Sequence, residues 1–128
     1  MTTLDEIKAT PLLDAEAIAE SKELMGDKFG KLVGYFLEDS AMYIGQVEQA
    51  FARGDAEGLV PPAHTLKSSS RQMGCARLAL LAEAVEHGGR DLVKQNGHVS
   101  ALASFIPVLR ATLDATVDAY HEVTPPGA

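Results

Sequence analysis

The 128-residue sequence has a single cysteine, no tryptophan and no long uninterrupted apolar run. The lone Cys75 cannot form an internal disulfide, which fits a reducing compartment, and we expect it to be a packing residue. No apolar stretch approaches the roughly 18 residues that span a membrane. The first residues are acidic where a secretory signal would be basic and then apolar. We therefore expect a cytoplasmic protein without a membrane segment.

Phosphate-binding loops and metal-ligand spacings are also missing from the sequence. No glycine-rich loop precedes a predicted helix, so nucleotide binding has no support. The histidines form no HxxxH pair and no ExxH motif of the kind found in di-iron bundles. Glu83 and His87 are four residues apart, a spacing far more typical of a solvated helix face than of a metal half-site. We expect neither a metal nor a cofactor.

Acidic residues are absent from one part of this acidic chain. The net charge of −7 argues against a general nucleic-acid-binding protein. Residues 1–57 contain twelve acidic and five basic residues, whereas residues 58–82 contain no acidic residue and three basic ones. The clearly basic surface should therefore surround residues 58–82, and it fits a site that holds an anion transiently.

The segment 63–74 has two opposed faces when it is written as a helix that turns by about 100° per residue. The polar stripe consists of His64, Lys67, Ser68 and Arg71. The opposite, apolar stripe consists of Leu59, Leu66 and Met73. Such a helix would bury Leu66 and Met73 and expose His64 to solvent, so this histidine is the strongest candidate for a chemical role.

Apolar residues at helical spacing and flanking capping residues predict five helices. Their expected ranges are 15–25, 28–51, 63–73, 75–87 and 101–122. Asp14 is expected to cap the first of these helices, and Asp27 the second. Gly88 and Gly89 are expected to end the fourth helix.

Three prolines make the helix boundaries harder to predict. Pro61 and Pro62 lack the N–H groups that a helix from residue 55 would need. Either that helix is kinked, or a turn at 56–60 precedes a helix that starts at Pro61, where proline is tolerated. Pro107 is expected to kink the last helix.

Long amphipathic helices joined by short turns, with no strand alternation, predict an all-α fold. We expect an antiparallel four-helix bundle with an additional short N-terminal helix. The chain is long enough for one domain, residues 1–128, with an ordered core at about 14–122. Residues 1–13 and the C-terminal TPPGA are expected to be a loose lead-in and a frayed tail.

The string AHTLKSSS at residues 63–70 is followed by Gly74, Leu78, Leu81, Glu86, Gly89 and Arg90. This pattern resembles the histidine-containing phosphotransfer (HPt) domain of two-component phosphorelays, which reads roughly AHxLKGSSxxxGxxxLxxLCxxLExxGR. The resemblance covers residues 63–90 without a gap. It implies a phosphoryl carrier, with His64 as the phosphorylated histidine and Lys67 as the family lysine.

The resemblance also implies roles for residues around His64. Glu86 matches a position that carries Glu or Gln beside the histidine ring, where a carboxylate could orient the ring through Nδ1–H. Apart from the resemblance, the positive charges of Lys67 and Arg71 would offset the charge on phosphoryl oxygens. Ser68 replaces a family glycine that is understood to allow close approach of the partner, and Arg90 matches a family arginine. We expect Ser68 and Arg90 to contact the partner.

The partners implied by the resemblance are response-regulator receiver domains and a hybrid or sensor histidine kinase. The chain has nothing to bind ATP or Mg²⁺, so the receiver should supply the metal and most of the catalysis. We expect a monomeric phosphoryl carrier without autonomous kinase activity, and no nucleic-acid partner.

Two other hypotheses compete with this one. A scaffold of the same fold that no longer transfers phosphate is disfavoured because His64 and Lys67 are both retained. The other is an unrelated helical adaptor or a kinase dimerisation helix pair. The dimerisation motif has an acid directly after its histidine, where Thr65 stands here, and a dimerisation domain lacks the additional helices, so the helix pair is disfavoured.

Overall fold

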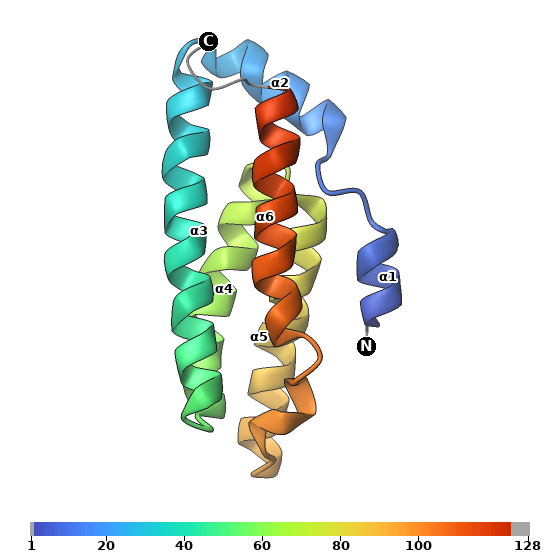
Figure 1. The fold of residues 1–128 in the computed structure, drawn as a ribbon, viewed down its shortest axis with the longest axis vertical. Coiled ribbons are helices and arrows are strands. Elements are labelled where there is room, and N and C mark those ends of the chain that lie inside the picture. Colours follow the sequence, from blue (N-terminus) through green and yellow to red (C-terminus); the bar gives the residue numbers. More distant parts are fainter. Residues whose placement is uncertain (1, 124–128) are drawn as a thin grey trace.

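The computed structural model describes residues 2–123, which contain six α-helices, one short 3-10 helix and no β-strand. The elements are α1 (Leu4–Ala9), α2 (Ala15–Met25), α3 (Lys28–Ala52), α4 (Ala56–Gln72), α5 (Ala76–Gln95), η1 (Val99–Leu102) and α6 (Ile106–Val123). Helices α3 to α6 form an antiparallel bundle, α2 lies across one end, and α1 runs along its outside (Figure 1). The all-α bundle is confirmed, although two short helices precede it instead of one.

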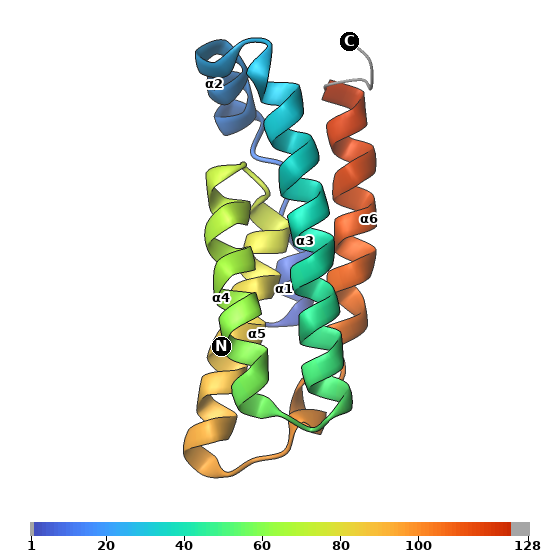
Figure 2. The same ribbon diagram turned by 90° about the vertical axis from the view of Figure 1, so that its left-hand side faces the viewer.

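Because their apolar residues recur at helical spacing, α3 and α4 each bury one face in the core. Along α3, Phe29, Val33 and Phe36 recur at helical spacing and are buried. On α4, Leu59 and Leu66 are fully buried, which stabilises the fold by about 1.5–3 kcal/mol for each side chain. Because α4 packs against both α3 and α5 (Figure 2), only the face opposite these leucines is open to solvent.

The caps of the first long helices agree only partly with the sequence pattern. The Asp14 carboxylate accepts a hydrogen bond from the Ala17 N–H at 3.1 Å, as predicted for an N-cap. Asp27 does occupy the N-cap position of α3, but its side chain makes no capping hydrogen bond and its backbone is itself helical, so the prediction is confirmed for the position and wrong for the bond. At the far end of α6, the Lys22 ammonium donates to the Val123 carbonyl at 2.6 Å and fixes α2 across the bundle.

Helix α4 begins at Ala56 and runs through both prolines, so the alternative of a start at Pro61 is wrong. The Asp55 carboxylate caps it by accepting from the Gly58 N–H at 2.9 Å. Pro61 and Pro62 cannot donate to the carbonyls four residues before them. Packing against two neighbouring helices therefore outweighs the loss of two helical hydrogen bonds.

The expected end of α5 at Gly88 and Gly89 is also wrong, because the helix continues to Gln95. A Cβ at Gly88 would lie 2.6 Å from the Leu102 Cδ2 atom, and one at Gly89 would lie 3.1 Å from Val60 Cγ2. These glycines therefore allow close helix packing and do not act as a stop. The helix ends where Asn96 adopts a left-handed conformation with φ of 51°.

Pro107 does not kink the last helix. The chain instead forms η1 and a turn, and α6 begins at Ile106. Pro107 thus lies in the first turn of α6, where its missing N–H leaves no helical hydrogen bond unmade.

The lead-in at residues 1–13 contains α1, which the sequence pattern did not predict. Thr3 caps this helix, and Ile7 is fully buried. The Arg77 side chain on α5 donates to the Thr10 carbonyl at 2.7 Å, which fixes the end of α1. Six residues are too few for a helical period to be visible in sequence. The predicted frayed tail, TPPGA, lies outside the described residues.

One segment within the described residues, Val99–Val123, is long and apolar enough to meet the criteria for a membrane span. Its buried side chains, including Leu109, Leu113 and Tyr120, pack in the bundle core. Core packing therefore accounts for its apolar composition.

Cys75 is fully buried, which confirms its prediction as a packing residue. Its Sγ lies 3.1 Å from the Tyr120 hydroxyl, and this hydroxyl donates to the Met73 carbonyl. Burial raises the pKa of the Cys75 thiol to about 11, so the thiol stays protonated.

Candidate functional site

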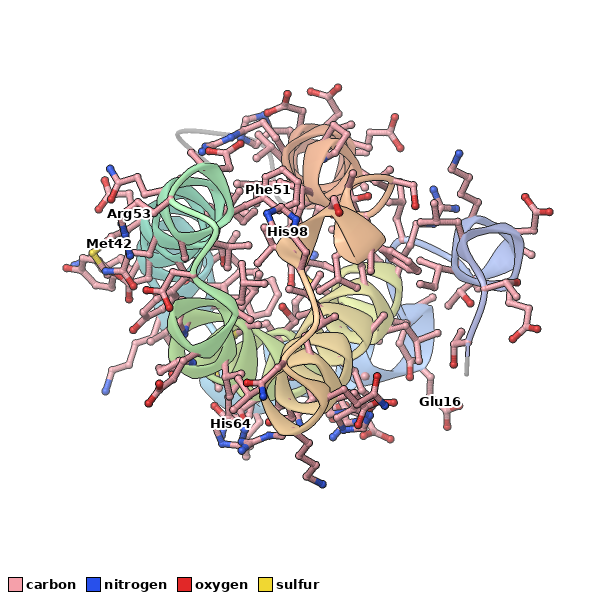
Figure 3. The ribbon with its side chains drawn as sticks, turned by 90° about the horizontal axis from the view of Figure 1, so that it is seen from below. Glu16, Met42, Phe51, Arg53, His64 and His98 are labelled. Carbon is pink, nitrogen blue, oxygen red and sulfur yellow. The ribbon has the colours of Figure 1, made fainter. Side chains whose placement is uncertain are left out.

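His64 projects from α4 into solvent, with 54% of its side chain exposed. Figure 3 shows it at the outer edge of the bundle, on the side of α4 that faces away from the core. On the opposite side Leu59 and Leu66 are fully buried, which confirms the two predicted faces, whereas Met73 is only partly buried. A histidine in this position is accessible to a macromolecular partner.

A buried carboxylate on the neighbouring helix orients the His64 ring. Glu86 of α5 is only 3% exposed, and its Oε2 lies 2.8 Å from His64 Nδ1. An ionised carboxylate can only accept hydrogen bonds, so Nδ1 must carry the proton. The lone pair of the neutral ring then resides on Nε2, which is the nitrogen available for nucleophilic attack.

Two cations share the same carboxylate. The Lys67 ammonium lies 2.6 Å from Glu86 Oε1 as an ion pair, and the lysine side chain is only 13% exposed. The Arg90 guanidinium donates to Oε2 from Nη2 at 2.9 Å and from Nε at 3.3 Å. We call His64, Lys67, Glu86 and Arg90 the Glu86 cluster. With a neutral imidazole it carries one net positive charge, which favours an incoming anion.

The charge of Glu86 is maintained by its partners. Burial is the largest single influence and would raise the pKa of this carboxyl. The ion pair with Lys67 and the hydrogen bonds from Arg90 and His64 together outweigh burial and lower the pKa from 4.5 to about 2. Glu86 is therefore a fixed negative charge at physiological pH.

The lowered pKa of Glu86 makes a prediction about stability. A folded-state pKa below the unfolded value contributes stability above about pH 4.5, which is lost as the pH falls toward 2. Glu86→Gln should therefore lower the free energy of unfolding near pH 7 by on the order of 2–3 kcal/mol. Urea unfolding of both proteins near pH 7 and near pH 3 would measure this difference, which should shrink at the lower pH. An equal difference at both pH values would contradict the prediction.

Arg71 and Ser68 lie on the polar face of α4 but outside the Glu86 cluster. Arg71 donates to Glu83 of α5, one turn before Glu86. The structure thus does not bring Arg71 beside the His64 ring, and the sequence had given no reason to pair it with Glu83. Ser68 is exposed one turn after His64. Within residues 2–123, no three His, Cys, Asp or Glu side chains are placed to hold a metal ion.

Comparison with known proteins shows that this fold is that of a phosphotransfer domain. The family model described as the Hpt domain matches residues 31–119, so the chain belongs to this family. The crystal structure of histidine-containing phosphotransfer protein B (HptB) from Pseudomonas aeruginosa PAO1 is similar, with a TM-score of 0.76 and 25% sequence identity. The match covers 89% of this chain and 95% of HptB. No curated protein matches the sequence.

Membership of this family defines the general role of the chain. It is a phosphotransfer protein of two-component signalling, a phosphocarrier module of the kind that interacts with response regulators and histidine kinases. The matched range includes all four residues of the Glu86 cluster.

Proposed function

We propose that His64 accepts a phosphoryl group from the aspartate of a receiver domain and donates it to the aspartate of another. The observation that carries this proposal is the 2.8 Å hydrogen bond between His64 Nδ1 and the buried Glu86 carboxylate. It supports an exposed Nε2 nucleophile with a fixed proton on the other ring nitrogen. The same transfer in reverse returns the phosphoryl group, so the geometry serves both directions.

The proton on Nδ1 is essential to the chemistry in both directions. As Nε2 attacks the phosphorus of an aspartyl phosphate, the N–P bond forms, the P–O bond breaks, and the electron pair returns to the aspartate carboxylate. The ring becomes cationic, and the Glu86 carboxylate stabilises that charge as the triad aspartate does for its histidine. When the phosphoryl group leaves, the retained Nδ1–H allows a neutral imidazole to depart.

The remaining charges of the cluster favour the phosphorylated state. The two positive charges of Lys67 and Arg90 together outweigh the single negative charge of Glu86. The Lys67 ammonium can leave the Glu86 carboxylate and form an ion pair with a phosphoryl oxygen instead. Arg71 stands two turns beyond His64 and would assist only after leaving Glu83. The partner receiver supplies the metal ion and most of the catalysis, and residues 1–128 act as one monomeric domain without kinase activity of their own.

The proposal is tested by incubating the protein with phosphorylated receiver domains from the same organism. We expect label to move to this chain and to be stable in alkali but labile in acid, as a phosphohistidine is. Binding of receivers without transfer of label would favour a scaffold of the same fold and contradict the proposal.

Lys67→Ala should slow transfer but not eliminate it. The ammonium contacts the phosphoryl group without being the nucleophile, so its loss removes one charged hydrogen bond. The expected decrease in transfer rate or in phosphohistidine lifetime is about ten- to hundredfold. Single-turnover labelling and decay of the label measure both quantities. Lys28→Ala, at the exposed start of α3, is the control, and equal behaviour of the two variants would assign Lys67 to a structural role.

A further inference from the structure

A cleft lies beside the Glu86 cluster, between the first turns of α4 and the last turns of α5. Its volume is about 540 Å³. It is lined by Glu57, Val60 and Pro61 of α4 and by Arg90, Val93 and Lys94 of α5. The cleft exists because α5 continues past its two glycines, which brings the segment after Gly89 alongside α4.

The lining combines an exposed apolar surface with positive charge. Val93 is 45% exposed and adjoins Pro61 and Val60, so the cleft offers a small apolar surface that no part of residues 2–123 covers. Two of its charged residues are cations, Arg90 and Lys94, against one acid, although the whole chain is acidic. This surface is complementary to a segment that carries an apolar side chain and a carboxylate.

Arg90 connects the cleft to the phosphotransfer site. Its guanidinium donates to Glu86, and the same side chain lines the cleft. In-line transfer requires the partner's aspartate to reach bonding distance of His64, so the residues that flank this aspartate must lie over neighbouring parts of α4 and α5. The cleft is one of these neighbouring surfaces.

We infer that the cleft docks the acidic and apolar segment of the receiver domain that flanks its phosphoaccepting aspartate, with Lys94 and Val93 as specificity-determining residues. The inference rests on the proposed function. It adds the place on this chain where the acidic segment of the receiver domain binds. Charge distinguishes this cleft from the groove of about 250 Å³ between α3 and α4, whose lining includes Leu32 and Tyr35. Among the residues that line that groove, Asp39 is the one charged residue, and its carboxylate would repel an acidic segment.

The test compares variants on the two surfaces with a control on α1 that lines neither of them. Val93→Asp and Lys94→Glu alter the cleft, Tyr35→Asp alters the groove, and Lys8→Glu reverses an exposed charge on α1. Each protein is mixed with the phosphorylated receiver domains of the same organism, and the rate of phosphoryl transfer is measured. Phosphoramidate, which phosphorylates histidine with release of ammonia, serves as a small donor that needs no docking, and each receiver rate is divided by the phosphoramidate rate.

Each cleft variant should lower this ratio about tenfold, whereas Lys8→Glu should leave it at the wild-type value. Circular dichroism checks that Val93→Asp is folded. If Val93→Asp is unfolded, the ratio measured for Lys94→Glu, which changes an exposed residue, tests the inference on its own. Wild-type ratios in both cleft variants, or an equal decrease in Lys8→Glu, would overturn the inference while leaving the proposed function intact. Failure of every receiver to label the wild type would instead overturn the proposed function, and the inference with it.

Discussion

Replacement of His64 by Gln is expected to abolish phosphoryl acceptance completely. The Gln side chain can still donate an amide N–H toward Glu86, but it has no nitrogen lone pair able to attack phosphorus. Since His64 is more than half exposed, the substitution should change the free energy of unfolding by no more than about 0.5 kcal/mol. Labelling by phosphorylated receivers and urea unfolding, carried out on the same preparation, separate loss of chemistry from loss of fold.

His87→Gln is the matched control for this experiment. His87 is an exposed histidine on α5, next in sequence to Glu86, and it makes no hydrogen bond to the Glu86 cluster. This control protein should accept label at the wild-type rate. Label on His64→Gln, or loss of label in His87→Gln with an intact fold, would refute the assignment of His64.

The parts of the fold that could be predicted are those governed by local pattern. The bounds of α2 and almost the whole of α3 follow from helical spacing and from turn glycines, because each of these signals lies within the helix itself. The error at the end of α5 arose where a contact with a distant element decides the outcome. Gly88 and Gly89 read as a helix stop in sequence, but they make room for Leu102 and Val60.

In the functional site, too, the features set within one helix could be predicted from the sequence, and the contacts between helices could not. The exposed position of His64 follows from the period of α4 alone. Its contact with Glu86 crosses between two helices, so it was expected from the family resemblance and not from spacing. The pairing of Arg71 with Glu83 could not be predicted because it depends on the register of α5 against α4. The cleft between α4 and α5 could not be predicted, because the sequence pattern ended the fourth helix at residue 87 and residues 90–95, which form one side of the cleft, were not expected to be helical.

Replacement of Ser68 by Gln is expected to block transfer from receivers although His64 is untouched. Ser68 is exposed on α4 one helical turn from His64, so its side chain lies within any surface that brings a receiver aspartate to the ring. A long side chain there holds the partner away. Since a misplacement of about 1 Å can lower a transfer rate roughly hundredfold, a decrease of at least that size is expected.

Ser68→Gly tests the same surface in the opposite direction. Removing the Cβ and hydroxyl should widen the range of receivers that transfer to His64, at a cost in helix stability of roughly 0.5 kcal/mol. Ala111→Gln, on an exposed position of α6, is the control for adding a long side chain to a helix. Transfer rates for wild type and the three variants across several receivers, each divided by the phosphoramidate rate, separate docking from intrinsic reactivity. If Ser68→Gln accepts phosphate at the wild-type rate, receivers do not dock over this turn of α4, because an added side chain there cannot be withdrawn from an exposed helical face.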